Sequence, residues 1–173
     1  FALPPQMVHD QIVAVVEDLH TAAIKIGMLA NAEVANSVAD ALEQCNIPII
    51  LDPVIVSSSG HRLLSIEAQE SVKERLLPLS TLITPNIPEM EALTSVTLST
   101  YKDKERAANY LIELGAKAIL LKGGHEEGDT KSDTLFLASP TGIKATTFSS
   151  QTIHTKNIHG TGCTLSAAIA AFI

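Results

Sequence analysis

The stretch Ile47-Pro48-Ile49-Ile50-Leu51-Asp52-Pro53 decides how this chain folds. A short apolar run that stops at a carboxylate and a proline is typical of a strand buried on both faces of a sheet. Further short apolar runs follow the same pattern at residues 22–26, 81–83 and 118–121. Because helical patterns separate these runs, the sequence predicts an α/β fold, a three-layer α/β/α sandwich around a mostly parallel central sheet.

Helices are predicted where apolar residues recur every three or four positions. These stretches are residues 4–20, 32–44, 65–77, 88–93 and 103–114. Residues 134–137 and 143–148 are expected to pair as a β-hairpin around a Ser-Pro-Thr-Gly turn. The last helix is expected to start after the glycines at 160 and 162 and to be buried, because its residues are small and apolar.

Composition limits the classes of partner. The chain has 173 residues, which fits a single domain, and its 12 basic and 19 acidic residues give a net charge of −7. Without a basic run or an aromatic stacking platform, a nucleic acid or an anionic membrane is not expected as a partner. No apolar stretch in the sequence has the length of a transmembrane helix.

The cysteines and the chain ends give two more expectations. Cys45 and Cys163 make neither a disulfide framework nor a zinc-binding set, which indicates a reducing compartment and a cytoplasmic protein. Cys45 is expected to be a small buried apolar residue. Phe1 starts the chain without a methionine and Ile173 stops inside an apolar run, so residues 1–173 are expected to be one domain lacking its N-terminal and C-terminal portions.

Polar and glycine-rich motifs follow the predicted strands. Gly27-Met28, Asp52-Pro53, Thr84-Pro85-Asn86 and Lys122-Gly123-Gly124-His125 each come directly after an apolar run. In open parallel sheets, ligands bind beyond the carboxyl ends of the strands. All these motifs are therefore expected at the one edge of the sheet where a ligand would bind.

Two of the motifs carry carboxylates, and each has two interpretations. Asp52 can help to hold Mg²⁺, which prefers carboxylates and retained waters, or it can open a turn before Pro53. Glu89 can lie near a magnesium-phosphate group, but Asn86 followed by Glu89 also has the spacing of a helix capping box. Local sequence favours the cap, although both interpretations hold if the helix start faces a ligand.

The remaining strand-end motif contains a lysine. Lys122 can contact phosphate while Gly123 and Gly124 leave room for a nucleotide, or the motif can be a simple exit from the strand. Metal binding by His125, His154 or His159 is not expected, because no second histidine or cysteine stands at ligand spacing.

The segment His159-Gly160-Thr161-Gly162-Cys163 precedes the last predicted helix. Glycines let the backbone approach a ligand closely, and a helix N-terminus attracts anions and favours a thiolate. The segment therefore predicts an anion site beside a reactive thiol, or else a tight loop before a core helix. It has neither the lysine of a P-loop nor the glycine spacing of a dinucleotide-binding motif.

Taken together, these motifs resemble those of the hydroxymethylpyrimidine and phosphomethylpyrimidine kinases of thiamine biosynthesis, in the ribokinase-like superfamily. The resemblance rests on Lys25-Ile26-Gly27-Met28-Leu29, Leu51-Asp52-Pro53-Val54, Thr84-Pro85-Asn86-Ile87-Pro88-Glu89, Lys122-Gly123-Gly124-His125 and residues 157–166. They occur in family order along nearly the whole chain. Most related sugar kinases have Gly-Ala-Gly-Asp where this chain has Gly160-Thr161-Gly162-Cys163, so the cysteine points to the pyrimidine kinases.

The resemblance implies a kinase that uses ATP and Mg²⁺. It would phosphorylate 4-amino-5-hydroxymethyl-2-methylpyrimidine and then convert the monophosphate to the diphosphate, in the cytoplasm and as a homodimer. The resemblance implies that Cys163 is the catalytic base and that Gly160, Thr161 and Gly162 form an anion hole. It places Gly27 and Met28 at the pyrimidine, and Lys122, Gly123 and Asn86 at ATP. Asp52 and Glu89 would bind the metal.

Other functions fit the same motifs. A pyridoxal kinase of the same fold that uses a cysteine is the nearest alternative. A non-catalytic module that binds the pyrimidine would keep its ligand when Cys163 is replaced, whereas a kinase would lose turnover. A redox thiol protein is less favoured, because Cys163 has no resolving cysteine nearby in the sequence.

Overall fold

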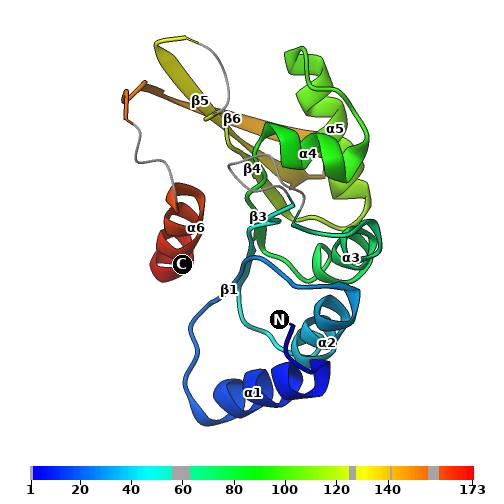
Figure 1. The fold of residues 1–173 in the computed structure, drawn as a ribbon. Helices are drawn as coiled ribbons and strands as arrows, with labels where there is room; N and C mark the ends of the chain where they lie inside the picture. Colours follow the sequence, from blue (N-terminus) through cyan, green and yellow to red (C-terminus); the bar gives the residue numbers. More distant parts are fainter. Residues whose placement is uncertain (1, 56–62, 125–127, 141, 156–159) are drawn as a thin grey trace.

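A computed structural model of the chain describes residues 2–55, 63–124, 128–140, 142–155 and 160–173. These residues form a six-stranded sheet whose strands lie side by side in chain order (Figure 1). The strands are β1 (Ile24–Ile26), β2 (Ile49–Leu51), β3 (Leu82–Ile83), β4 (Ala118–Leu121), β5 (Thr130–Ser139) and β6 (Gly142–Gln151). β1 to β4 pair in parallel and β5 pairs antiparallel with β4 and β6, which confirms the mostly parallel sheet.

The helices that precede β4 lie along one face of the sheet, and the last helix lies on the other face (Figure 1). They are α1 (Pro5–Asp18), α2 (Ala32–Leu42), α3 (Ile66–Ser71), α4 (Ile87–Thr94), α5 (Tyr101–Glu113) and α6 (Thr161–Phe172). Because β1 to β4 advance in one direction and crossovers are right-handed, the connecting helices all fall on the same face. The three predicted layers are present, and α6 forms the third layer within the described ranges.

The hydrophobic core fills the space between the sheet and helices α2 to α5. All three residues of β2 are buried, as expected for a central strand covered on both faces. Aliphatic side chains make up most of the core, and Phe136 of β5 is its one fully buried aromatic residue within the described ranges. The core therefore rigidly supports the ends of β2, β3 and β4, where the polar motifs begin.

Local sequence signals locate several helix starts. The side chains of Asn31 and Ser65 accept hydrogen bonds from the backbone N–H groups of Val34 and Ala68, which is the usual role of asparagine and serine at the N-cap of a helix. The helix predicted over residues 65–77 is α3 followed by a π-helix, η1 (Val72–Leu76). The hairpin is longer than predicted, because β5 and β6 pair along their whole lengths.

The expectation of a buried last helix is wrong in two respects. α6 begins at Thr161, inside the glycine segment and not after it. Its only buried residue is Ser166, whereas Phe172 is 92% exposed. Small apolar residues favour a helix through their intrinsic propensity, but burial needs a covering element, and no described element covers the outer side of α6.

No helix within the described ranges is both long enough and apolar enough to span a lipid bilayer.

Candidate active site

The site is built around Asp52, which follows β2 at the carboxyl edge of the sheet. Its backbone N–H donates to the carbonyl oxygen of Ile26 at 2.9 Å, so β1 and β2 together fix its position. The Asp52 residue is 2% exposed. A carboxylate this deeply buried needs cations or hydrogen-bond donors around it.

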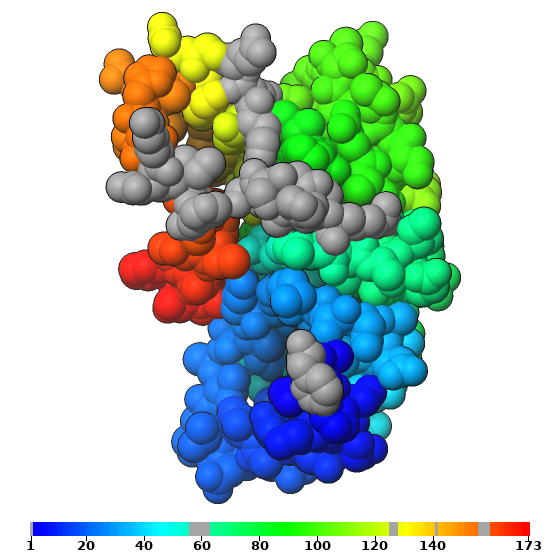
Figure 2. Space-filling view, viewed as in Figure 1, coloured from blue at the N-terminus to red at the C-terminus, as the bar shows by residue number. Residues whose placement is uncertain are grey.

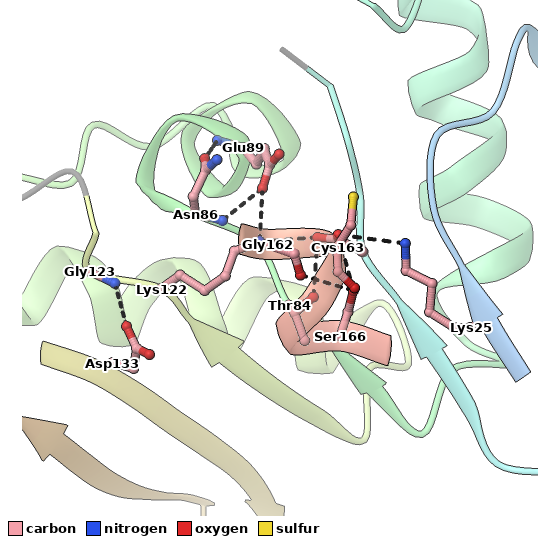
Figure 3. Close-up of polar contacts among 11 residues, drawn as sticks. Lys25, Thr84, Asn86, Glu89, Lys122, Gly123, Asp133, Gly162, Cys163 and Ser166 are labelled. Atoms are coloured by element: carbon pink, nitrogen blue, oxygen red, sulfur yellow. Dashed lines mark hydrogen bonds and ion pairs between the residues drawn. The ribbon is translucent and has the colours of Figure 1, made fainter. Parts of the chain in front are cut away.

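Four side chains from different elements surround the Asp52 carboxylate (Figure 3). Lys122 Nζ lies 3.0 Å from Oδ1, and Thr84 Oγ1 donates to the same oxygen at 3.3 Å. Ser166 Oγ donates to Oδ2 at 3.2 Å, and Lys25 Nζ lies 3.8 Å from that oxygen. The donors come from β1, from the residues that directly follow β3 and β4, and from α6, so this one carboxylate connects the sheet edge to the last helix.

Lys122 is held at the end of β4 by its backbone. Its N–H donates to the carbonyl oxygen of Pro85 at 2.9 Å, and it forms a parallel bridge with Asn86. Its Nζ also lies 3.9 Å from Glu89 Oε2, so the ammonium stands between the carboxylates of Asp52 and Glu89. The prediction that these motifs meet at one edge of the sheet is confirmed.

Asn86 and Glu89 form the capping box that their spacing predicted. Glu89 N–H donates to Asn86 Oδ1 at 2.8 Å, and Asn86 N–H donates to Glu89 Oε2 at 2.8 Å. Burial raises the pKa of Glu89 from an ordinary value of 4.5 to about 7. The hydrogen bond from Asn86 and the charge of Lys122 oppose this rise, while the charge of Asp52 adds to it.

The segment opposite Asp52 is the start of α6. Gly160 caps the helix with φ of 78°, a left-handed conformation that favours glycine, and its carbonyl oxygen accepts from Thr164 N–H at 2.8 Å. Gly162 and Cys163 therefore lie in the first helical turn. Cys163 is exposed, and its sulfur points away from the groups around Asp52 (Figure 3). The thiol is accessible to a ligand at the edge of the sheet.

Two glycines make room for the two lysines. A Cβ atom built at Gly162 would lie 3.3 Å from Lys122 Nζ, and one built at Gly27 would lie 2.6 Å from Lys25 Nζ. A side chain at Gly27 would therefore displace the Lys25 ammonium, and one at Gly162 would press on that of Lys122. Gly27 and Gly162 are suited to the site because a lysine ammonium lies close to their backbone, whereas Gly160 is suited to it because of its left-handed backbone conformation.

Two predicted residues stand apart from the cluster. Met28 is 58% exposed and therefore lines no enclosed pocket formed by the described residues. The N–H of Gly123 already donates to Asp133 Oδ1 at 2.8 Å, so this group is not directed at a phosphate in this structure. Cys45 is half-buried and its thiol donates to the carbonyl oxygen of Ala41, in agreement with the structural role expected for it.

No role was predicted from the sequence for Lys25, Thr84, Ser166 or Asp133. Lys25 carried a visible signal, because a charge inside a short apolar strand is costly unless it is paired. Thr84 and Ser166 lay inside the quoted motifs, but their contact with Asp52 joins positions far apart in the chain. No local pattern predicts such a contact.

Among the described residues, no histidine contacts the Asp52 carboxylate. His154 is exposed, while His125, His159 and Asn157 lie outside the described residues. Among the residues that the structure describes, no group of three or more histidine, cysteine or acidic side chains could hold a metal. A metal at this edge would have to take most of its ligands from a substrate and from water.

Comparisons with known proteins show which family and which fold this chain matches. Residues 1–173 match the family described as phosphomethylpyrimidine kinase. The hydroxymethylpyrimidine/phosphomethylpyrimidine kinase of Helicobacter pylori is 41% identical over 177 residues, which cover 100% of this chain and 64% of that protein. The chain therefore spans slightly less than two thirds of the length of this curated relative.

Solved structures share the fold. The phosphomethylpyrimidine kinase of Clostridium difficile superposes with a TM-score of 0.79 at 34% identity, covering 98% of this chain and 68% of the other. An ADP complex of Bacillus subtilis pyridoxal kinase superposes with a TM-score of 0.85 at 28% identity, covering 99% and 62%. Sequence identity is thus higher to the pyrimidine kinase, although the backbone superposes somewhat better on the pyridoxal kinase.

Proposed function

The chain belongs to the phosphomethylpyrimidine kinase family, and we propose that it acts as the ATP-dependent kinase of a pyrimidine precursor of thiamine. The reaction would phosphorylate 4-amino-5-hydroxymethyl-2-methylpyrimidine and then its monophosphate, yielding the diphosphate. The observation that carries the proposal is the ion pair of Lys122 and Asp52, which lies beneath the start of α6. Gly160 is the N-cap of this helix, and the exposed thiol of Cys163 lies in its first turn. Cations, a helix N-terminus and a base are what phosphoryl transfer requires.

Cys163 is the proposed general base. Its sulfur is exposed in the first turn of α6, where the positive end of the helix dipole favours a negative charge. The thiolate would accept the proton of the substrate hydroxyl as its oxygen attacks the terminal phosphorus of ATP. Proton removal by a positioned group contributes roughly 10²- to 10⁴-fold to a rate.

The backbone of Gly160, Thr161 and Gly162 is the proposed anion hole. The first N–H groups of a helix point toward its N-terminus, where the positive end of the helix dipole attracts anions. These groups would stabilise the charge that develops on the transferred phosphoryl group. Lys25 and Lys122 add positive charge beneath this turn.

Lys122, Gly123 and Asn86 are the proposed ATP contacts. The Lys122 ammonium is the most suitable of the three, because it is the only one of them that carries a positive charge for a phosphate. Asn86 uses its Oδ1 for the cap of α4, so only its amide NH₂ is left for a nucleotide. Gly123 would act through the space that it leaves, since its N–H is bonded to Asp133.

Asp52 and Glu89 are the residues that would hold Mg²⁺. Their carboxylates fit a cation, because both already face the single ammonium of Lys122. A pair of carboxylates with phosphate and water is the usual ligand set for this ion. When bound with ATP, the ion would neutralise phosphate charge. Gly27 and Met28, which follow β1 on the Lys25 side of Asp52, are the proposed contacts for the pyrimidine.

Acceptor specificity tests the proposal. The full-length protein, incubated with MgATP and the hydroxymethylpyrimidine, should form first the monophosphate and then the diphosphate. Mass spectrometry of the reaction mixture over time detects both products. A matched incubation without the pyrimidine should release little ADP. Absence of both phosphorylated products under conditions in which the protein is folded would contradict the proposed function.

A pyridoxal kinase is the second candidate, supported by the TM-score of 0.85 to a Bacillus subtilis pyridoxal kinase. The higher identity to the pyrimidine kinases favours the first proposal. Comparison of kcat/KM for the two acceptors separates them. A preference for pyridoxal would replace the first proposal with the second.

The finer statements about assembly and location are also proposals. We propose that the full-length protein is a cytoplasmic homodimer, as the family resemblance implies. Two free cysteines, one of them exposed, suit a reducing compartment. Sedimentation at several concentrations tests the dimer, and a monomer at micromolar concentration would contradict it.

A further inference from the structure

Ser166 is the one buried residue of α6. Its hydroxyl oxygen lies 3.2 Å from Asp52 Oδ2, 3.1 Å from the carbonyl oxygen of Gly162 and 3.1 Å from that of Cys163. The side chain thus stands between the carboxylate at the sheet edge and the helical turn that carries the thiol (Figure 3).

We propose that Ser166 is a positioning residue for phosphoryl transfer, which holds the first turn of α6 in register with the Asp52 carboxylate. The inference rests on the proposed kinase function, because it assigns Asp52 and Cys163 to one reaction. Ser166 itself would touch neither substrate. It acts through the relative placement of the proposed metal ligand, Asp52, and the proposed base, Cys163.

The hydrogen-bonding chemistry of the hydroxyl favours Asp52 as its partner. A serine has one proton to donate, and all three neighbouring oxygens are acceptors. A bond to a charged carboxylate is roughly twice as strong as a bond to a neutral carbonyl. The proton therefore goes to Asp52, and the carbonyl oxygens of the turn remain near the hydroxyl oxygen as alternative acceptors.

The surrounding sequence gives no other reason for a serine. The helix continues as Ala167-Ala168-Ile169-Ala170-Ala171, so alanine is the ordinary residue of this element. Alanine also has the higher helix propensity and buries no polar group. A hydroxyl that is 0% exposed costs free energy unless it is bonded, and the bond it makes here is to Asp52.

The attachment of α6 makes this contact important for geometry. Within the described ranges, the other residues of the helix are exposed or half-buried, so few packed side chains hold its start against the sheet. Cys163 and Gly162 lie three and four positions before Ser166, directly above it on the same face of the helix. A displacement of about 1 Å between reacting groups can reduce a rate by roughly 100-fold.

The test compares substitutions that separate hydrogen bonding from volume. Ser166→Thr keeps the hydroxyl, whereas Ser166→Cys adds comparable bulk and offers only a weak donor. We expect Ser166→Cys and Ser166→Ala to lower kcat by about 10- to 100-fold and to change the KM for MgATP by no more than about threefold. For Ser166→Thr, we expect kcat and KM each to stay within about threefold of the wild type. Equal kcat values for the Thr and Cys variants would overturn the proposal.

Ser80 offers the matched control. Its hydroxyl is equally buried and donates to the carbonyl oxygen of Leu76, four residues earlier, but it lies outside the Asp52 cluster. Ser80→Ala should destabilise the protein through the same kind of lost bond and leave kcat within about threefold. A similar loss of kcat in Ser80→Ala would mean that Ser166 matters only for stability, and would contradict a positioning role.

A double-mutant cycle tests the contact without any catalysis. Unfolding midpoints of the wild type, Ser166→Ala, Asp52→Ala and the double variant should show that the serine substitution has a smaller effect once Asp52 is absent. Equal effects in both backgrounds would overturn the inference. A wild type that unfolds normally, shows this coupling and has no kinase activity would instead contradict the proposed function.

Discussion

At the scale of single residues, Asp52 organises the site, because one buried carboxylate collects Lys122, Thr84, Ser166 and Lys25. Its role as a strand-end carboxylate was predictable from the sequence, since the apolar run before it stops at Asp-Pro. The identity of its partners was not. Ser166 is 114 positions away in the chain, and only the fold brings it to the carboxylate.

Glu89 should make the stability of the protein depend on pH. Its folded pKa of about 7 lies above the ordinary 4.5, so its contribution to stability is fully present below about pH 4.5 and is lost as the pH rises through about 7. Relative to Glu89→Gln, which retains the capping geometry, the wild type should lose roughly 2.5 kcal/mol of unfolding free energy between about pH 5 and about pH 8. Urea unfolding at several pH values measures this.

Glu113→Gln is the matched control for the substitution itself, because Glu113 lies exposed at the end of α5. At a single pH it should change the free energy of unfolding by less than about 0.5 kcal/mol. A constant difference between the wild type and Glu89→Gln across the whole range would mean that Glu89 titrates at an ordinary pH.

The two lysines should differ in their contribution to stability. Lys122→Met removes an ammonium that is 3.0 Å from one buried carboxylate and 3.9 Å from another, so a loss of about 3 kcal/mol is expected. Lys25→Met removes a more exposed ammonium at 3.8 Å and should cost about 1 kcal/mol or less. Chemical denaturation of both variants measures the difference, and a larger loss in Lys25→Met would reverse the assignment.

At the scale of helices and strands, features that depend on a few neighbouring residues were predicted from the sequence better than features that depend on contacts between distant parts of the chain. The buried strands β2 and β4 and the caps at Asn31, Ser65 and Asn86 follow from short sequence patterns, and all are present. The π-helix after Ser71 and the start of α6 at Thr161 were not predicted. Both depend on packing or on backbone conformations that similar sequences adopt only in a suitable tertiary setting.

The start of α6 should depend on the absence of a side chain at Gly160. Gly160→Ala places a Cβ in a left-handed conformation and should cost about 1–2 kcal/mol. Gly124→Ala is the matched substitution, because its φ is not in that region and a Cβ there would meet no atom within 4 Å. Equal unfolding free energies for the two variants would show that the helix start does not need the left-handed residue.

At the scale of the whole molecule, the order of the strands explains how the layers are filled. A sheet that advances in one direction puts α2 to α5 on one face and leaves α6 on the other (in Figure 2, α6 in red lies at the left of the molecule and α5 in green at the upper right). The same order brings the ends of β1, β2, β3 and β4 to one edge, opposite the start of α6. The positions of the apolar runs in the sequence predicted that these strand ends meet at one edge. The exposure of α6 was not predictable in this way, because it depends on which other element covers the helix.

We propose that phosphoryl transfer takes place at the edge of the sheet beneath α6, with Cys163 as the base. Turnover of the hydroxymethylpyrimidine by Cys163→Ala, with the Kd for MgATP determined on the same preparation, tests this role. We predict a loss of kcat of about 10²- to 10⁴-fold with the Kd changed by no more than about threefold. A variant that retains the kcat of the wild type would contradict the role of Cys163 and, with it, the proposed site.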